Sequence, residues 1–120
     1  MRVQNLKEFT TEYKHGSDWG LLLGEFLDEF YAHPDIKALE SEPELMDEEK
    51  DAYIAAIAEH LARRFGWSAP DWTKKQNRFL HKPLFVNGGL ESLKALLLVQ
   101  SPVAFRRRMI FVDDEHLSRV

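Results

Sequence analysis

The stretch Asp47–Gly66, DEEKDAYIAAIAEHLARRFG, decides the fold class of this 120-residue chain. Apolar residues recur in it at the spacing of three and four that places them on one face of an α-helix. The members of this face are Ile54, Ile57, Ala58, Leu61 and Phe65. Asp47 can cap the start of the helix, Arg63 and Arg64 suit the dipole at its end, and Gly66 can close it. We therefore expect one helix along this whole stretch.

A second amphipathic helix is expected over Asp18–Ala32. Its apolar stripe consists of Trp19, Leu22, Leu23, Phe26, Leu27, Phe30 and Tyr31, and its acidic face of Glu25, Asp28 and Glu29. Ser17 is the predicted N-cap. His33 should end the helix, because Pro34 disfavours helical geometry in the residue before it.

Shorter elements are expected between and after these helices. A helical turn should follow at Pro34–Glu40, and a brief helix carrying Trp72 should begin near Pro70. The stretch Leu90–Gln100 is apolar nearly all round, which is typical of a helix at the centre of a bundle. The remaining expectations are a short extended piece within His81–Gly89, a helix from Ser101 as N-cap and Pro102 as first residue through Arg108, an extended segment near Ile110–Val112, and a last turn at Asp114–Ser118 capped by Asp113.

The predicted fold class is therefore all-α, a single compact multi-helix domain of about five to seven helices. Residues 1–17 would form an N-terminal arm or short helix, and residues 18–120 the single helical domain. In this prediction Leu90–Gln100 is central, and the helices over Asp47–Phe65 and Asp18–Ala32 pack against it.

Charge is divided unevenly along the chain. The net charge is -4, with 30% charged and 44% hydrophobic residues. Residues 1–60 hold 5 basic and 15 acidic side chains, whereas residues 61–120 hold 11 and 5. This split argues against a uniformly basic nucleic-acid binder and against a uniformly acidic mimic. It predicts that the basic half pairs with the acidic half, within one chain or in a self-complementary homodimer.

The sequence also narrows the compartment and the chemistry. The first residues lack the apolar region of a signal peptide, and the longest apolar run, Ala95–Val99, is five residues long. We therefore expect a soluble cytoplasmic protein with no membrane partner. The chain contains no cysteine, which excludes disulfides, thiolate nucleophiles and cysteine-based zinc sites.

The most distinctive charged segment is Arg106-Arg107-Arg108, preceded by Ser101-Pro102-Val103-Ala104-Phe105. On a helix these arginines point in directions about 100° apart, so they cannot all face one partner. One interpretation is phosphate binding, because a guanidinium group suits phosphate oxygens. The other is ion pairing with the acidic face of Asp18–Ala32 or with the Glu42–Asp51 cluster.

A second basic group lies among aromatic residues. Its cations are Lys74, Lys75, Arg78 and Lys82, and the neighbouring aromatics are Trp67, Trp72, Phe79 and Phe85. Cations interleaved with rings are typical of single-strand nucleic-acid platforms. Aromatics in an irregular segment also plug the ends of helical cores, in which case the cations form a solvated face. The candidate interface or phosphate-binding residues are Arg106, Arg107, Arg108, Lys74, Lys75, Arg78, Trp67 and Trp72.

No pattern indicates a metal, a cofactor or a catalytic residue. The pairs Glu29 with His33 and Glu59 with His60 do not have the Glu-x-x-His spacing of di-metal bundles. The sequence also contains no HExxH, no GxSxG and no phosphate-cradling glycine loop. We expect no cofactor, and the assignment leans away from an enzyme.

One set of segments resembles a known group of proteins. The segments are AAIAEHLA at 55–62, PDW at 70–72, RFL at 78–80, SPVAFRRR at 101–108, IFV at 110–112 and LSRV at 117–120. In this order they resemble uncharacterised bacterial proteins that are similar to the region following the helix-turn-helix domain in some Xre-like transcriptional regulators. Some members stand alone and have been linked to nucleotidyltransferase-like or toxin–antitoxin genes. The resemblance covers about residues 18–120, and we expect no N-terminal DNA-binding domain here.

The resemblance implies a regulatory role, and the residues leave three functions open. The first is a non-enzymatic protein-interaction module of a bacterial cytoplasmic system that is toxin–antitoxin-like or transcription-associated, with a protein partner of unknown identity. The second is nucleic-acid binding through Arg106–Arg108 and the Lys74–Lys82 patch. The third is a small-molecule enzyme or sensor with a pocket under Trp67 and Trp72.

Overall fold

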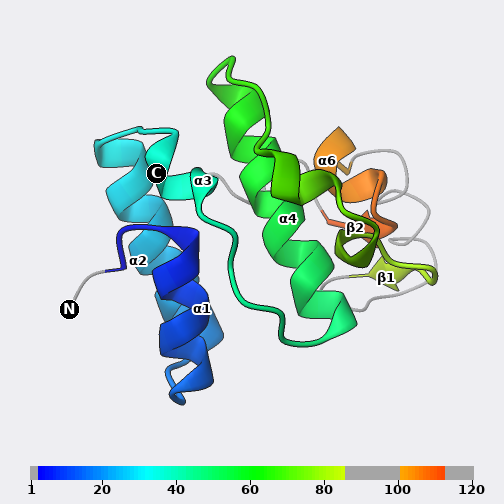
Figure 1. Cartoon of the computed structure of the whole chain (residues 1–120), viewed down its shortest axis with the longest axis horizontal. Coiled ribbons are helices and arrows are strands. Elements are labelled where there is room, and N and C mark those ends of the chain that lie inside the picture. Colours follow the sequence, from blue (N-terminus) through cyan, green and yellow to red (C-terminus); the bar gives the residue numbers. More distant parts are fainter. Residues whose placement is uncertain (1–2, 86–100, 113–120) are drawn as a thin grey trace. The chain divides into compact units, whose positions relative to one another are not determined.

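A computed structural model describes residues 3–85 and 101–112, and it confirms the all-α class (Figure 1). The described part holds five α-helices, two 3₁₀ turns and one pair of two-residue strands. The chain forms two compact units, one built from residues up to Leu45 and one from Met46 onward.

The first unit contains the predicted N-terminal segment and the first amphipathic helix. Its elements are α1 (Leu6–Lys14), α2 (Trp19–Ala32) and α3 (Lys37–Glu40). Helices α1 and α2 lie side by side (Figure 1). Trp19 joins them, because its ring meets those of Phe9 and Tyr13 edge-on at 4.9 and 5.1 Å. The expected turn after Pro34 is present as α3.

The start of α2 differs from the prediction by one residue. Its N-cap is Asp18 rather than Ser17, since an Asp18 carboxylate oxygen accepts a hydrogen bond from the Leu21 amide at 2.9 Å. The Asp18 carbonyl also accepts the first helical hydrogen bond, from Leu22. Ser17 therefore lies outside the helix, while the predicted end before Pro34 is confirmed by His33 as C-cap.

The second unit is built around α4 (Glu48–Arg64), which confirms the helix predicted from the opening stretch. The Asp47 side chain accepts from the Lys50 amide at 2.9 Å. At the other end Gly66 has a φ of 76°, and the amides of Gly66 and Trp67 donate to Arg63 and Ala62. These two bonds form a Schellman cap, which satisfies the last carbonyls of the helix.

Burial along α4 is wider than the predicted apolar face. Every residue from Asp51 to Glu59 is buried, including both of those carboxylates. A helix buried all round usually lies inside the core rather than on its surface. Ala52, Ala55, Ala56 and Ala58 make this feasible, because small side chains allow neighbouring backbone to approach.

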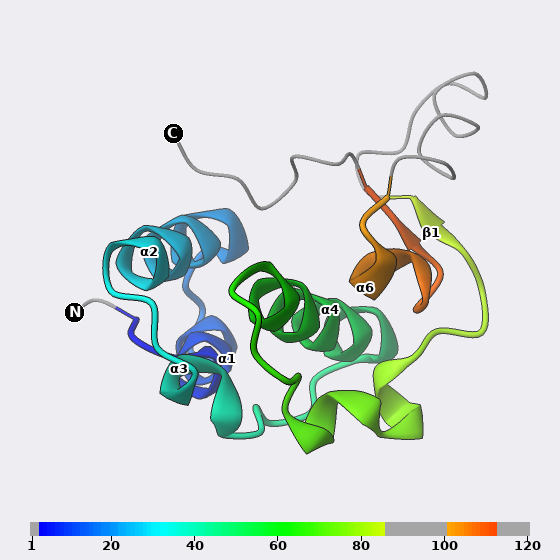
Figure 2. The same cartoon turned by 90° about the horizontal axis from the view of Figure 1, so that it is seen from above.

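Short elements complete the second unit (Figure 2). They are η1 (Asp71–Lys74), η2 (Gln76–Arg78), β1 (Leu84–Phe85), α6 (Val103–Arg106) and β2 (Ile110–Phe111). Of these, η1, η2 and α6 pack against α4, and the strand pair packs against α6. The brief helix predicted near Trp72 is present as the 3₁₀ turn η1. The expected extended pieces form a parallel pair with Leu84 opposite Ile110 and Phe85 opposite Phe111.

The prediction that Ser101 caps a helix beginning at Pro102 is wrong. Pro102, in extended conformation, is the N-cap residue of α6. The Ser101 hydroxyl instead bridges to the Val112 backbone, accepting from its amide and donating to its carbonyl at 2.9 Å each. Ser101 thus fastens the start of α6 to the end of β2. The helix expected over Leu90–Gln100 and the turn expected over Asp113–Ser118 lie outside the described residues.

Candidate functional site

A buried carboxylate on α4 gathers three arginines. Glu59 is 3% exposed, and both of its oxygens accept charged hydrogen bonds. Oε1 accepts from Arg108 Nη1 at 2.6 Å, and Oε2 accepts from Arg63 Nε at 2.7 Å and Arg107 Nη1 at 2.8 Å. Arg63 is one helical turn further along α4, whereas Arg107 and Arg108 come directly after α6. Glu59 therefore ties α6 to α4.

Arg108 is a structural member of this group. Its side chain is fully buried. Besides the Glu59 bond, it donates to the carbonyls of Thr73 at 2.7 Å, Ala104 at 2.8 Å and Arg78 at 3.1 Å. Its guanidinium also lies over the Phe79 ring, 4.5 Å from the centroid. A guanidinium fork can satisfy several acceptors in one plane, and this geometry uses it to join α4, α6 and both 3₁₀ turns.

The arginines keep Glu59 ionised. Burial raises the pKa of this carboxyl, but hydrogen bonds from Arg108 and Arg63 and the charge of Arg107 outweigh burial, so the pKa lies below its ordinary value of 4.5. Burial lowers the pKa of Arg108, and the bond and charge of Glu59 oppose that change. A guanidinium stays protonated across the biological range, so the group carries one negative and three positive charges.

The exposed side of this group opens into a pocket of about 320 Å³. We call it the basic pocket. Its lining residues are Glu59, Arg63, Trp67, Ser68, Ala69, Thr73, Lys74 and Arg107. The side chains of Arg63, Arg107 and Lys74 are 51%, 44% and 63% exposed, so their charged ends are accessible to a ligand.

The basic pocket has an excess of positive charge. Its lining holds three cations and one carboxylate, and that carboxylate also pairs with the buried Arg108. Asp71 is 3.8 Å from Lys74 but fully solvated, so it offsets little of this charge. An anion is therefore the complementary ligand.

The structure brings three of the eight predicted site residues together, since Trp67, Lys74 and Arg107 all line the basic pocket. Three others are buried: Trp72, Arg78 and Arg108. Arg78 lies 4.9 Å over the Trp72 ring and donates to the Asp51 carbonyl at 3.4 Å. Lys75 and Arg106 are exposed and are not among the pocket's lining residues.

Sequence reasoning missed two charged members of the pocket, Glu59 and Arg63. It considered Glu59 beside His60 as a piece of a metal site, and Arg63 as a partner of the helix dipole. Their spacing of four residues was the available signal, because Glu and Arg at i and i+4 share a helix face. The partnership with Arg107, 48 residues away, left no local trace.

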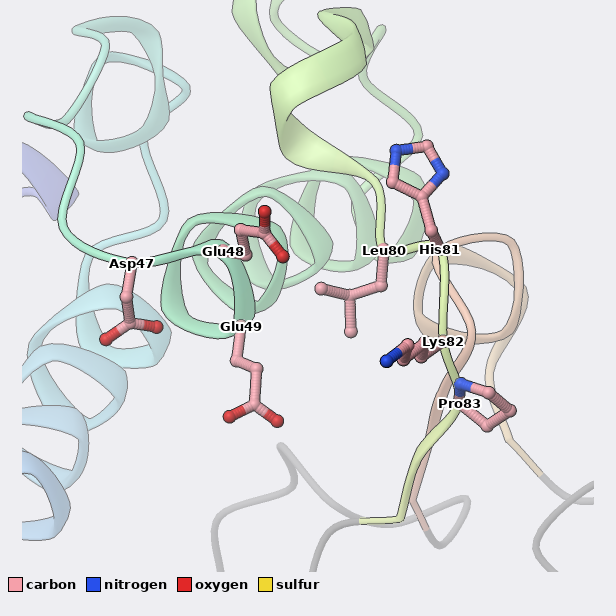
Figure 3. Close-up of a pocket in the computed structure, with 7 residues that line it drawn as sticks. All are labelled: Asp47, Glu48, Glu49, Leu80, His81, Lys82 and Pro83. Atoms are coloured by element: carbon pink, nitrogen blue, oxygen red, sulfur yellow. The ribbon is translucent and has the colours of Figure 1, made fainter.

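A second pocket lies at the start of α4 and has a volume of about 630 Å³ (Figure 3). Asp47, Glu48 and Glu49 form one wall, and residues 80–83 form the other, with Lys82 reaching from that wall toward the helix (Figure 3). Asp47 already caps α4 and pairs with Lys50 at 3.0 Å. The wall of carboxylates is therefore explained by the stabilisation of a helix start.

Two further features bear on function. Within residues 3–85 and 101–112, no three His, Asp or Glu side chains cluster so as to hold a metal ion. No helix in that same part of the chain is both long and apolar enough to span a bilayer.

Comparison of the chain with protein families, with curated proteins and with solved structures finds no match.

Proposed function

We propose that this chain is a non-enzymatic interaction module of a bacterial cytoplasmic regulatory system, and that it binds an acidic segment of a partner protein through the basic pocket. The observation that carries the proposal is the Glu59 group, in which one carboxylate holds Arg63 and Arg107 at the surface and compensates only part of their charge. The resemblance to the region following a DNA-binding domain in Xre-like regulators supports the regulatory setting.

The composition of the pocket suits protein recognition. Arginine and tryptophan are the residue types most often responsible for binding energy in protein interfaces. Trp67 is held in place by Phe65, whose ring stacks on it at 5.2 Å and 21°. Glu59 fixes one nitrogen of each exposed arginine, so less side-chain entropy is lost when a carboxylate of the partner binds.

Site-specific photo-crosslinking in the native host tests this proposal. A photoreactive amino acid replaces Ser68, which is exposed in the basic pocket, and in a control chain it replaces His81, which is exposed outside it. We expect a single crosslinked protein of discrete mass from position 68, absent from position 81. Arg107→Gln should remove this product and Arg106→Gln should preserve it. No product, or a product indifferent to Arg107→Gln, would refute the proposal.

Nucleic-acid binding is the second candidate, and one observation favours it. Lys75, Lys82 and Arg106 are exposed and add to the cations of the basic pocket within the second unit. A backbone of phosphates could contact several of them together. The basic pocket alone favours the first function, because a compact concave site fits a short acidic segment better than an extended strand.

A further inference from the structure

We infer that the basic pocket is also a binding site for a nucleoside phosphate, with the phosphoryl group on Arg63, Arg107 and Lys74 and the base against Trp67. A volume of about 320 Å³ falls within the usual size range of small-molecule sites. This inference rests on the proposed function in one respect: the nucleotide would regulate the module by occupying the groups that engage the acidic partner.

The arrangement of the guanidinium groups suits a tetrahedral anion. Arg63 and Arg107 both donate to the same oxygen, Glu59 Oε2, from 2.7 and 2.8 Å. Two groups bound to one atom are held close together. Each gives Glu59 one nitrogen, and a guanidinium has five N–H donors, so both retain donors for a ligand. A phosphoryl group has three acceptor oxygens and can accept from both guanidinium groups at the same time.

The charge of the pocket favours a dianion over a single carboxylate. Glu59 neutralises one charge, while Arg63, Arg107 and Lys74 line the pocket and Arg108 lies behind it. A carboxylate of a ligand would neutralise one more charge. A phosphate monoester carries close to two negative charges at neutral pH, since its second pKa is about 6. It therefore compensates more of the excess charge with one group.

Trp67 supplies the second half of the site. The indole is half-buried, lines the same pocket as the cations, and is kept in place by the stacked Phe65 ring. A nucleobase stacking on an aromatic side chain contributes about 1–3 kcal/mol and tolerates any base. The pocket lining near Trp67 in the sequence also includes the small side chains of Ser68 and Ala69. Phosphate recognition and an aromatic platform thus occur together in one cavity.

Calorimetric titration of the full chain with five probes tests this inference. The probes are AMP, GMP, ribose 5-phosphate, adenosine and inorganic phosphate. We expect both mononucleotides to bind at least tenfold more tightly than any of the other three, because only they engage the cations and Trp67 together. Equal affinity for AMP and inorganic phosphate would overturn the inference and would indicate a simple anion site.

Paired variants connect the binding to the pocket. Arg107→Gln should weaken AMP binding by roughly tenfold or more, the usual loss for a charge-assisted hydrogen bond, whereas the adjacent Arg106→Gln should leave it unchanged. Trp67→Leu should weaken AMP binding but not phosphate binding, and Trp67→Phe should restore most of the loss. Equal effects of the two arginine variants, or no effect of Trp67→Leu, would overturn the assignment.

A competition experiment separates failure of this inference from failure of the proposed function. AMP is added during crosslinking at position 68, where we expect it to suppress the partner product. If the crosslinked partner forms but AMP neither binds nor competes, the nucleotide site is refuted and the interaction module stands. If AMP binds and no partner is captured, the proposed function fails and the nucleotide site stands.

Discussion

Glu59 illustrates how one side chain can serve both stability and recognition. A buried carboxylate costs several kcal/mol unless charged partners and hydrogen bonds compensate it. Arg108 provides that compensation from the protein interior, and Arg63 and Arg107 provide it from the surface. The same bonds that stabilise Glu59 therefore position the two exposed guanidinium groups.

Replacing this carboxylate should be costly. Glu59→Gln preserves the shape of the side chain but removes its charge, which leaves Arg108 buried without an anion. We expect the free energy of unfolding to fall by about 3 kcal/mol, as when a buried ion pair loses one partner. Urea denaturation would measure it. Glu49→Gln, an exposed carboxylate on the same helix, should cost less than about 1 kcal/mol and is the matched control.

The same variant should change the dependence of stability on pH. The pKa of Glu59 is lower in the folded chain than its ordinary value of 4.5, so between these two values the unfolded chain binds a proton that the folded chain does not. The contribution of Glu59 is thus fully present above about pH 4.5 and is lost as pH falls through the folded pKa. In Glu59→Gln this part of the slope should disappear. A variant with the wild-type acid transition would contradict the assignment.

At the scale of elements, the ends of α4 show why some boundaries are readable from sequence. Asp47 caps its start and Gly66 closes its end, both as expected. These residues act through local backbone geometry, which neighbours in sequence largely determine. At α2 the predicted cap was Ser17, and the hydrogen bond from the Leu21 amide instead goes to the next residue, Asp18.

Gly66 provides a test at this scale. Its φ of 76° is unfavourable for any residue with a Cβ, so Gly66→Ala should lower the free energy of unfolding by about 1 kcal/mol, although space around the residue is open. Gly20→Ala is the control: Gly20 is an exposed α2 residue, and an added Cβ would meet the Asp18 carboxylate only at 3.4 Å. It should be neutral or stabilising in the same denaturation assay. Equal losses would contradict this role for Gly66.

Side chains that bridge distant elements could not be predicted in the same way. The hydroxyl of Ser101 looked like a helix cap, because Ser followed by Pro is a common helix start. In the folded chain it is used eleven residues away, on the Val112 backbone. Likewise Trp67, Lys74 and Arg107 were recognisable as candidates, but their meeting in one pocket depends on how α6 returns to α4. The sequence therefore identifies candidate residues, but the tertiary fold determines which of them come together in one site.

At the scale of the whole molecule, the structure shows one instance of the predicted pairing between the acidic and basic halves of the chain. Glu59 belongs to the acidic residues 1–60, and its partners Arg107 and Arg108 belong to the basic residues 61–120. This pairing lies within the second unit, and it uses Glu59 instead of the predicted partners, the acidic face of Asp18–Ala32 and the Glu42–Asp51 cluster. The pocket thus has a local excess of positive charge although the total charge of the chain is -4.

Salt dependence should reveal which ligands this charge distribution accepts. A contact limited to Arg63, Arg107 and Lys74 neutralises at most three phosphates, so log K against log salt should fall with a slope no steeper than about -3. Nucleic-acid binding that also used Lys75, Lys82 and Arg106 should give a slope of about -5. Titrations between about 50 and 200 mM salt would distinguish the slope of about -3 from that of about -5. The steeper slope would favour the second candidate function.

The separation between Glu59 and Arg108, 49 residues along the chain, has a consequence for the order of folding. During synthesis α4, which carries both Glu59 and Arg63, is complete before Arg107 and Arg108 have been made. Until then Arg63 is the one member of the three arginines that can compensate Glu59, so burial of this carboxylate stays costly and a nascent α4 should keep it hydrated. Closure of the second unit thus waits for residues 107 and 108. Such a long-range contact is expected to form late and to slow folding, since the loop that it closes costs entropy before any stabilisation is gained.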